Sequence, residues 1–273
     1  MAWLDEEISR IRRGSRSKAR GRLFTVMIIL LAVAVVLAIA AAFFYAEDRK
    51  TVIIRIEGTM VAGDGIGGGY VGSEYIGRQL RSAADDPLVE AIVLRVNSGG
   101  GSPVAAQEII RDLEYARQKK PIVVSMGDIA ASAAYHVSAH ADVIYANPDS
   151  MTGSIGSIWL FYDISRYLSD EGIAIDVIKS GAMKDMTSPY RKLSDEERDY
   201  AQDVVDASFE EFIADVVEQR GISREAVDDA RLIRGEEALE IGLVDRIGNL
   251  FDAVEGAKNL AATVRSSAEA APS

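Results

Sequence analysis

The sequence predicts an α/β fold with largely parallel strands, preceded by one N-terminal transmembrane helix. From residue 51 onward, strand-like segments alternate with segments of helical spacing, which is typical of parallel strands joined by right-handed crossovers. Residues 23–46 contain no charged side chain, and no long Pro- or Gly-rich linker divides the rest. We therefore divide the chain into a basic segment (1–22), a membrane-spanning segment (23–46), one globular domain (47–264) and a tail (265–273) that we expect to be disordered.

The membrane-spanning segment is predicted from its length and from the charges on either side. A helix over 23–46 would be roughly 36 Å long, enough to cross a hydrocarbon core of about 30 Å. Arg and Lys residues crowd the segment before it, whereas Glu47 and Asp48 follow it. The positive-inside rule then leaves the N-terminus in the cytoplasm and residues 47–264 outside. A cleaved signal peptide is the alternative, but the apolar run exceeds the roughly 7–15 residues of a secretory signal, so we expect an uncleaved anchor in the cell membrane.

The elements of the globular domain follow from local patterns. Apolar or β-branched runs predict strands over residues 51–56, 91–96, 121–126, 142–146, 173–179 and 244–247. Helical spacing and start signals predict helices over 74–84, from 103, over 130–139, 164–171, 194–221, 224–230 and 236–241, and from 250. Ser194 and Glu197 form a capping box, and Gly221 suits a helix end. The glycine-rich segment 63–72 is expected to be a mobile loop.

Composition excludes several chemistries. The chain has 273 residues, no Cys, two His and a net charge of −12. The absence of Cys excludes thiolate nucleophiles and cysteine metal sites, and the acidic balance argues against nucleic acid as a partner. Because His is scarce, a hydrolase with this sequence needs a base other than imidazole.

Two motif matches are weak. The glycines between Gly67 and Gly72 match a dinucleotide fingerprint, but about ten residues separate them from the preceding strand, where the fingerprint needs direct succession. His136 and His140 share a helix face, as in zinc proteases, yet Val137 stands where such helices carry Glu and no third ligand is evident. We expect ordinary packing for both histidines, with no metal and no cofactor.

Three other places favour chemistry. The turn Asn97–Ser102 joins a strand to a helix through three glycines, so its backbone N–H groups can face a carbonyl oxygen. Ser132 lies among small residues at a helix start, and Lys184 lies between two methionines in a loop, where desolvation would favour its neutral form. Taken singly, each has an ordinary alternative: a simple turn, tight helix packing and a surface lysine.

Together these segments resemble the signal peptide peptidase (protease IV) family of Ser–Lys peptidases. The resemblance rests on Ser132 in Gly-Asp-x-Ala-Ala-Ser and on Lys184 in Ser-Gly-x-x-Lys-Asp-x-x-Ser-Pro-x-Arg, with Asn97–Ser102 and Thr152–Gly156, and it covers nearly all of residues 51–255. It implies a Clp protease/crotonase-like fold of repeated ββα units, with 47–264 as the peptidase domain. It also implies that Ser132 is the nucleophile and Lys184 the general base.

The resemblance implies further roles and partners. Ser154 would orient the lysine, and the amides of Gly99 and Ala133 would form the oxyanion hole. Short members of the family form dome-like homo-oligomeric rings, an octamer among them, in which neighbouring protomers contribute the serine and the lysine. The implied function is a membrane-anchored serine endopeptidase acting on hydrophobic peptides such as remnant signal peptides.

One departure and two alternatives stay open. The family usually has Gly-Gly-Tyr-Tyr after the serine, where this chain has Ala133-Ala134-Tyr135-His136, which bears on cleavage preference. A stomatin-operon-type Ser–Lys membrane protease would use similar chemistry, and a catalytically silent membrane scaffold would retain the fold alone.

Overall fold

The computed structural model describes residues 24–40 and 49–270, which fall into two compact units divided after Lys50. Residues 24–40 of the first unit form a helix. The predicted span 23–46 extends past this helix at both ends, and those ends lie outside the described residues, as does the basic segment 1–22. No helix within 24–40 or 49–270 is both long enough and apolar enough to cross a membrane.

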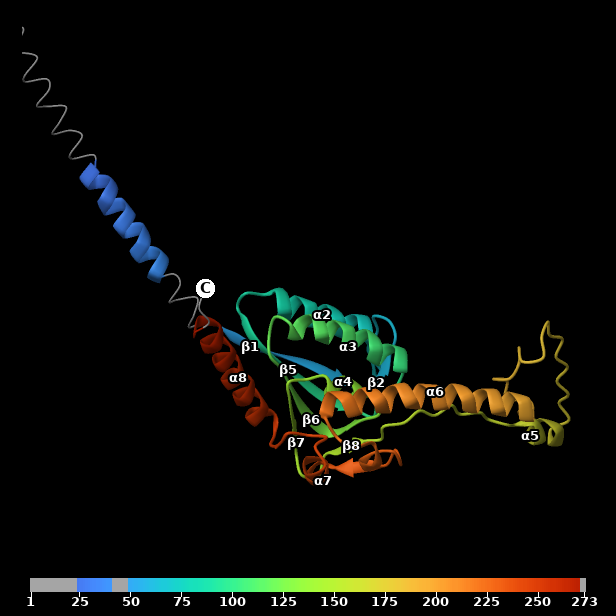
Figure 1. The fold of residues 1–273 in the computed structure, drawn as a ribbon. Helices are drawn as coiled ribbons and strands as arrows, with labels where there is room; N and C mark the ends of the chain where they lie inside the picture. Colours follow the sequence, from blue (N-terminus) through green and yellow to red (C-terminus); the bar gives the residue numbers. More distant parts are fainter. Residues whose placement is uncertain (1–23, 41–48, 271–273) are drawn as a thin grey trace, which may run out of the picture. The chain divides into compact units, whose positions relative to one another are not determined.

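The second unit is a mixed α/β arrangement around a mostly parallel sheet (Figure 1). Among its described residues the sheet has seven strands, in the order β1-β5-β6-β7-β10, and β8 pairs with both β6 and β9. All the pairings of β6, and that of β7 with β10, are parallel, whereas β8 and β9 are antiparallel. The predicted α/β class with largely parallel strands is therefore confirmed. The strands are β1 (Lys50–Glu57), β5 (Val89–Ser98), β6 (Ile122–Ala131), β7 (Val143–Ala146), β8 (Met151–Gly153), β9 (Leu232–Arg234) and β10 (Arg246–Ile247).

A second, three-stranded sheet includes half of the residues of the loop expected at 63–72. It consists of β2 (Thr59–Val61), β4 (Tyr70–Gly72) and β3 (Ile66–Gly67), in that order. Gly72 is needed where the backbone folds back tightly, because a Cβ there would lie 2.2 Å from the carbonyl oxygen of Gly63. Gly72 thus serves close backbone approach, whereas Gly67, Gly68 and Gly69 have positive φ values around the turn between β3 and β4.

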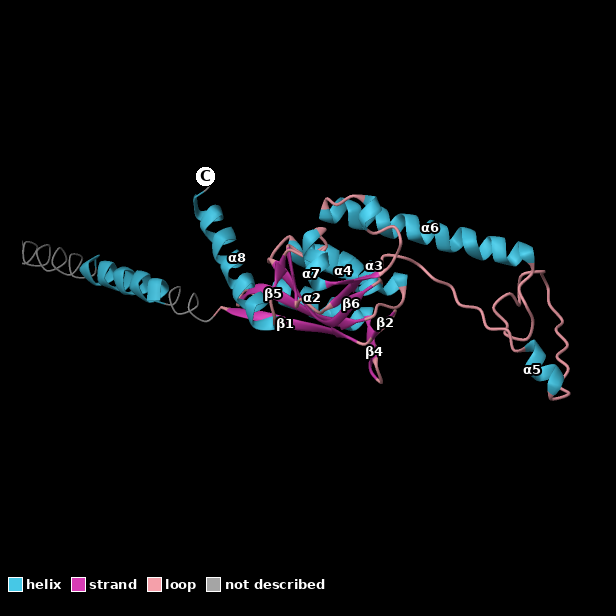
Figure 2. Cartoon of the chain, turned by 90° about the horizontal axis from the view of Figure 1, so that it is seen from below, coloured by secondary structure: helices cyan, strands magenta, loops and turns pink. Residues whose placement is uncertain are grey.

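Helices cover both faces of the main sheet (Figure 2). One face, with Ile92, Leu94 and Val96 of β5, packs against α2 (Ser73–Asp85), α3 (Pro103–Arg117) and α4 (Ala133–Ala139). The alternate residues Ala91 and Val93 face α8 (Leu250–Ala270). The prediction of a disordered tail from residue 265 is wrong as far as residue 270, because α8 continues past residue 264 to Ala270.

Strand β6 changes partner along its length. Val123–Ser125 pairs with β7, whereas Ile129–Ala131 pairs with β8. The predicted strand at 121–126 therefore runs on to Ala131, and the following helix begins at Ala133 rather than at 130. Small residues suit both structures, and the pairing with β8 decides between them.

A long helix carries an extended segment away from the sheet. Helix α6 (Asp195–Arg220) begins at the predicted capping box, where Ser194 Oγ accepts from the Glu197 amide at 3.2 Å, and ends at Gly221 with φ 62°. Ser157 Oγ and Ser208 Oγ are hydrogen-bonded at 2.8 Å, and we name residues 158–207 beyond them the arm. Figures 1 and 2 show α5 (Ser165–Asp170) and the loop that follows it at the end of α6 far from α4. The remaining elements are η1 (Arg224–Ala226) and α7 (Gly235–Glu240).

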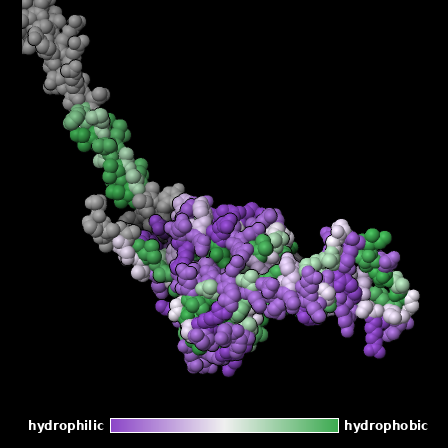
Figure 3. All heavy atoms as spheres, turned by 45° about the vertical axis from the view of Figure 1, so that its right-hand side comes forward, coloured by the Kyte–Doolittle hydropathy of each residue, from purple (hydrophilic) through white to green (hydrophobic). Residues whose placement is uncertain are grey.

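The arm exposes apolar side chains to an unusual degree (Figure 3). Ile158 is 83% exposed, Tyr162 73% and Ile178 97%. The strand predicted at 173–179 is wrong for the described chain, because its residues are exposed and pair with no other strand there. Its apolar pattern suits a strand, but a lone strand without a partner leaves its backbone groups unpaired.

Candidate active site

Ser132 occupies the sharp junction between β6 and α4. Its φ is 54° and its ψ is −130°, a conformation that a residue with a Cβ rarely adopts. The amide of Ser132 donates to the carbonyl of Gly153 at 2.9 Å, and its own carbonyl accepts from the His136 amide at 2.9 Å. Backbone strain of this kind typically costs of order 1–3 kcal/mol and persists where the surroundings hold it. The half-buried hydroxyl is thus fixed at the start of a helix.

The glycine turn lies directly against this junction. An added Cβ on Gly100, whose φ is 102°, would lie 2.9 Å from Ser132 Cβ and 2.9 Å from the amide nitrogen of Ala133. Among the described residues, neither the Gly99 amide nor the Ala133 amide donates a hydrogen bond to the protein. Two unsatisfied N–H groups beside the half-buried hydroxyl of Ser132 are what an oxyanion hole requires.

Two side-chain contacts hold the turn in place. The amide oxygen of Asn97 accepts from the backbone of Asp128 at 3.0 Å and of Ile129 at 3.3 Å. The hydroxyl of Ser98 accepts from the Gly100 amide at 3.1 Å. The bonds of Asn97 fasten the end of β5 to the last part of β6, and the bond of Ser98 holds the turn itself, so the turn and Ser132 are positioned by the same pair of strands.

Ser154 follows β8 at a second strained position. Its φ is 50°, and its amide donates to the carbonyl of Arg231 at 2.8 Å. Because Gly153 pairs with Ala131 and accepts the amide of Ser132, the chain brings Ser154 next to the serine junction. Four of the residues singled out in the sequence therefore gather at one corner of the sheet. We name this group, Gly99, Ser132, Ala133 and Ser154, the serine corner.

Lys184 lies elsewhere, in the arm. Its side chain is exposed, and it belongs to the loop between α5 and α6, which Figure 1 shows at the far end of α6. Along α6, Phe212 lies beside the serine corner, and the 17 residues back to Asp195 correspond to about 25 Å. The single chain does not bring Lys184 to Ser132.

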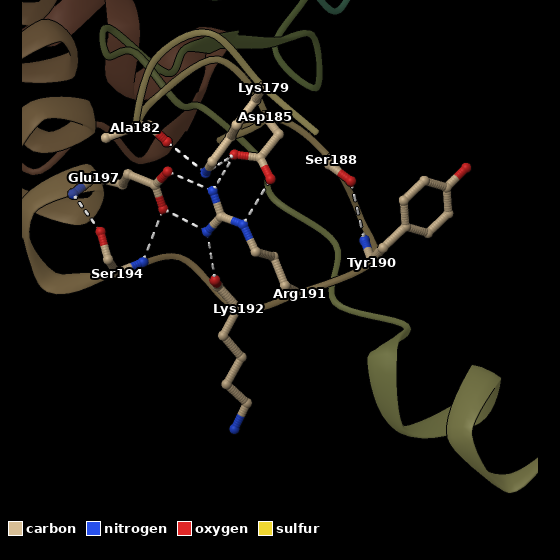
Figure 4. Close-up of polar contacts among 9 residues, drawn as sticks. All are labelled: Lys179, Ala182, Asp185, Ser188, Tyr190, Arg191, Lys192, Ser194 and Glu197. Atoms are coloured by element: carbon tan, nitrogen blue, oxygen red, sulfur yellow. Dashed lines mark hydrogen bonds and ion pairs between the residues drawn. The ribbon is translucent and has the colours of Figure 1, made fainter. Parts of the chain in front are cut away.

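A network of charges orders the loop that contains Lys184 (Figure 4). Arg191 donates Nη2 to Oδ1 of Asp185 at 2.6 Å and to Oε1 of Glu197 at 2.6 Å, and Lys179 also reaches Asp185 at 2.6 Å. The Arg191 guanidinium, with help from Lys179, holds the pKa of Asp185 well below its usual range. Arg191 and the Ser194 amide lower the pKa of Glu197 to about 2. The sequence motif contains these residues, but nothing in it indicates that they bind one another.

A small pocket adjoins Ser132 on the side of α6. Its wall combines the serine corner, the start of α3 and the inner part of α6, with Gly101, Pro103, Gln107, Ser132, Ala133, His136, Ser157, Ser208, Glu211 and Phe212 as its lining. The ring of Phe212 stacks on that of His136 with centroids 4.4 Å apart. The pocket can receive a short side chain next to the hydroxyl.

The two histidines have a partner that the sequence did not reveal. Asp215 of α6 lies within hydrogen-bond distance of both, at 2.6 Å from His136 and 2.8 Å from His140. Burial alone would raise the pKa of Asp215, but the bonds from both rings hold that pKa well below its usual range. Asp215 lies on a helix with many acidic residues, so no local pattern distinguishes it.

Comparison with known proteins identifies related chains. Residues 114–264 match the family model of peptidase family S49. Protease 4 of Salmonella typhi is 39% identical over 197 residues, which cover 71% of this chain and 32% of that protein. A protein of Methanocaldococcus jannaschii named as a protease is 35% identical over 195 residues, covering 69% and 62%. A protein of Enterococcus faecium named as a signal peptide peptidase is 34% identical over 223 residues, covering 78% and 64%. The chain spans less than two thirds of each of these relatives.

Proposed function

This chain belongs to peptidase family S49, the signal peptide peptidase (protease IV) family, and on that premise we propose that it is a membrane-anchored serine endopeptidase with a Ser132–Lys184 dyad. The observation that carries the proposal is the strained serine at the β6–α4 junction, next to two backbone amides without protein partners. The change of partner along β6, which forms this junction, also favours the crotonase-like fold that the sequence motifs imply.

The reaction follows from the groups at the corner. Ser132 Oγ attacks the scissile carbonyl while Lys184 Nζ takes the hydroxyl proton, and the ammonium then returns a proton to the leaving amine. The carbonyl oxygen becomes an oxyanion that accepts from the amides of Gly99 and Ala133. Ser154 lies beside the junction, where its hydroxyl can orient the incoming lysine.

The lysine of each site is supplied by a neighbouring copy in a homo-oligomeric ring. The separation of Lys184 from Ser132 along α6 supports this arrangement, as do the apolar side chains that the arm exposes. Burying residues such as Ile158 and Ile178 against a second copy would stabilise the ring by roughly 25 cal/mol per Å² of apolar surface.

The membrane and the substrate are proposed on similar grounds. The uncharged run 23–46, whose described part 24–40 is helical, supports an anchor, and the Arg and Lys residues before it support an N-terminus in the cytoplasm. The pocket beside Ser132, with Phe212 in its wall, suits an apolar side chain of a peptide. Hydrophobic peptides left in the membrane, such as remnant signal peptides, fit both features.

The decisive experiment uses two variants and their mixture. Ser132→Ala and Lys184→Ala should each abolish hydrolysis of an unstructured hydrophobic peptide, whereas Lys192→Ala, a change of an exposed lysine in the same arm, should not. When equal amounts of the two inactive subunits are exchanged into common rings, about a quarter of the wild-type rate should return, because one interface in four pairs an intact serine with an intact lysine.

Each failure has a distinct meaning. Normal turnover by Lys184→Ala would refute the lysine base. Verified subunit exchange without any recovery would refute the contribution from a neighbouring copy. A wild-type chain that neither cleaves peptides nor reacts with a serine-directed phosphonate would instead indicate a catalytically silent scaffold.

A further inference from the structure

Three metal-ligating side chains converge between α4 and α6, apart from the residues of the proposed reaction. Nε2 of His136 and Nε2 of His140 lie 2.6 Å and 2.8 Å from the same Oδ2 of Asp215. All three ligand atoms lie within 4.8 Å of one another. Ligands of tetrahedral zinc lie about 2.0–2.2 Å from the ion and hence roughly 3.3 Å apart. A small outward movement of the Asp215 carboxylate is enough to admit an ion.

The three side chains are held in place by packing. The side chain of His140 is 4% exposed, that of His136 14% and that of Asp215 30%. The stacking of Phe212 on His136 fixes the plane of one ring. Ligands that are already ordered lose little rotational freedom when an ion binds, which favours affinity.

The second nitrogen of His140 supplies an independent indication. Nδ1 is buried and makes no hydrogen bond within the described residues, although Oε1 of Glu114 lies only 3.4 Å away. While both rings donate from Nε2 to Asp215, a neutral His140 leaves Nδ1 bare. When Nε2 binds a metal, the proton of the neutral ring resides on Nδ1, where it faces the Glu114 carboxylate. A carboxylate behind the second ring nitrogen is the usual arrangement around metal-binding histidines.

We propose that His136, His140 and Asp215 bind one zinc ion, with a water molecule in the fourth position. Two imidazoles and one carboxylate suit Zn²⁺, whereas Mg²⁺ and Ca²⁺ prefer oxygen ligands throughout. His140 is the buried ligand and Asp215 the most exposed of the three, while Glu114, which faces the second nitrogen of His140, is itself about half exposed. The proposal does not depend on peptidase activity, because it concerns binding alone.

The position of this zinc site links it to Ser132. His136 lines the pocket beside the serine, and its amide donates to the Ser132 carbonyl at 2.9 Å. A bound ion would join the helix that follows the nucleophile to the inner part of α6. We therefore expect zinc to raise the thermal unfolding temperature and, where hydrolysis is observed, to slow it by narrowing the pocket.

The test titrates zinc into the full chain, purified in detergent and stripped with a chelator. Calorimetry should detect one Zn²⁺ per chain, and Co²⁺ in its place should give the intense visible absorption of a tetrahedral site. His136→Asn and Asp215→Asn should each weaken binding at least 10-fold, and Glu114→Gln about 10-fold. Glu218→Gln, a change of an exposed carboxylate on the same helix, should leave binding unchanged.

Two outcomes would overturn the zinc site. Weak binding of several ions that is insensitive to the three substitutions would indicate only the acidic surface. X-ray absorption of the zinc-loaded wild-type chain tests the ligands directly, even if a variant does not fold. It should show scattering from two imidazole rings, and a spectrum without imidazole contributions would refute the assignment.

Discussion

The serine corner and the arm are built on opposite principles. At the corner, Ala131, Ala133, Ala134 and Tyr135 are buried, and the Tyr135 hydroxyl donates to the carbonyl of Leu243 at 2.8 Å. In the arm, apolar side chains lie on the outside, and ion pairs around Arg191 provide the internal order. The corner can therefore keep a strained residue in place by itself, whereas the arm needs a second surface to cover it.

This difference separates two requirements of the proposed chemistry. Nucleophile and oxyanion donors must be fixed to within fractions of an ångström, and a packed core provides that. A base on a separate arm reaches the serine only after assembly, so an isolated chain would hold an incomplete site. Substitutions at the two regions should accordingly affect different measurements.

Apart from removal of Ser132 or Lys184 itself, the largest expected effect is at Gly100. Gly100→Ala would force a Cβ to 2.9 Å from Ser132 Cβ and the Ala133 nitrogen, at a φ of 102°. A displacement of about 1 Å at the serine can lower turnover roughly 100-fold, and peptide hydrolysis measures it. Gly65→Ala, a change outside the proposed site, is the control, because its Cβ would meet nothing within 4 Å and its φ is not positive. Equal losses in the two variants would contradict the proposed role of close packing at Gly100.

A smaller loss is expected from the arm. Arg191→Met removes the shared partner of Asp185 and Glu197, so the loop containing Lys184 loses its order. We expect hydrolysis to fall roughly 10- to 100-fold. The thermal unfolding temperature of the sheet domain should stay near that of wild type. Arg198→Met, in the same region, is the control, and a large fall in unfolding temperature for Arg191→Met would show that the arm and the core are not separate.

The arm should also respond to acid before the core does. The folded-state pKa of Glu197 is lowered to about 2, and that of Asp185 is also lowered, so both stabilise the arm fully above their ordinary pKa values near 4. This stabilisation is lost as the pH falls from about 4 toward 2. Fluorescence of Trp159 in a Trp3→Phe background should report it. An acid transition of Trp159 that Arg191→Met leaves unaltered would contradict the assignment.

The smallest expected effect is at the start of α6. Ser194→Ala removes the hydroxyl that accepts from the Glu197 amide, which should cost about 1 kcal/mol of local helix stability. Amide hydrogen exchange should quicken in the first turn of α6 and stay unchanged near Phe212. Faster exchange along the whole helix would mean that its two ends unfold together.

The sequence predicted the elements whose signals are local. The capping box at Ser194 and the strand around Ala91–Val96 follow from neighbouring residues, and the structure confirms both. Predictions were wrong where distant pairing decides, as at the end of β6, where β8 extends a strand through residues that also suit a helix. The apolar run 173–179 reads as a strand, but the described chain offers it no partner.

The same division applies to the site. The small residues around Ser132 and the glycines after Asn97 predict from the sequence that the backbone approaches closely at this site, because only small residues permit such an approach. The approach of Asp215 to His136 joins residues 79 positions apart, and only the packing of α6 on α4 brings them together. A carboxylate on a highly acidic helix carries no distinguishing local signal.

Because the amide of Ser132 is hydrogen-bonded to Gly153, the number of residues in β6 before Ser132 cannot change by one without displacing the serine. Side chains alternate along a strand, so inserting or deleting one residue in β6 before Ala131 would turn every later side chain to the opposite face. The serine would then point into the core, whatever its neighbours. The exposed loop of the arm after Lys184 is not a strand, so an insertion there would not turn later side chains to an opposite face. We therefore expect related chains to differ in length at that loop.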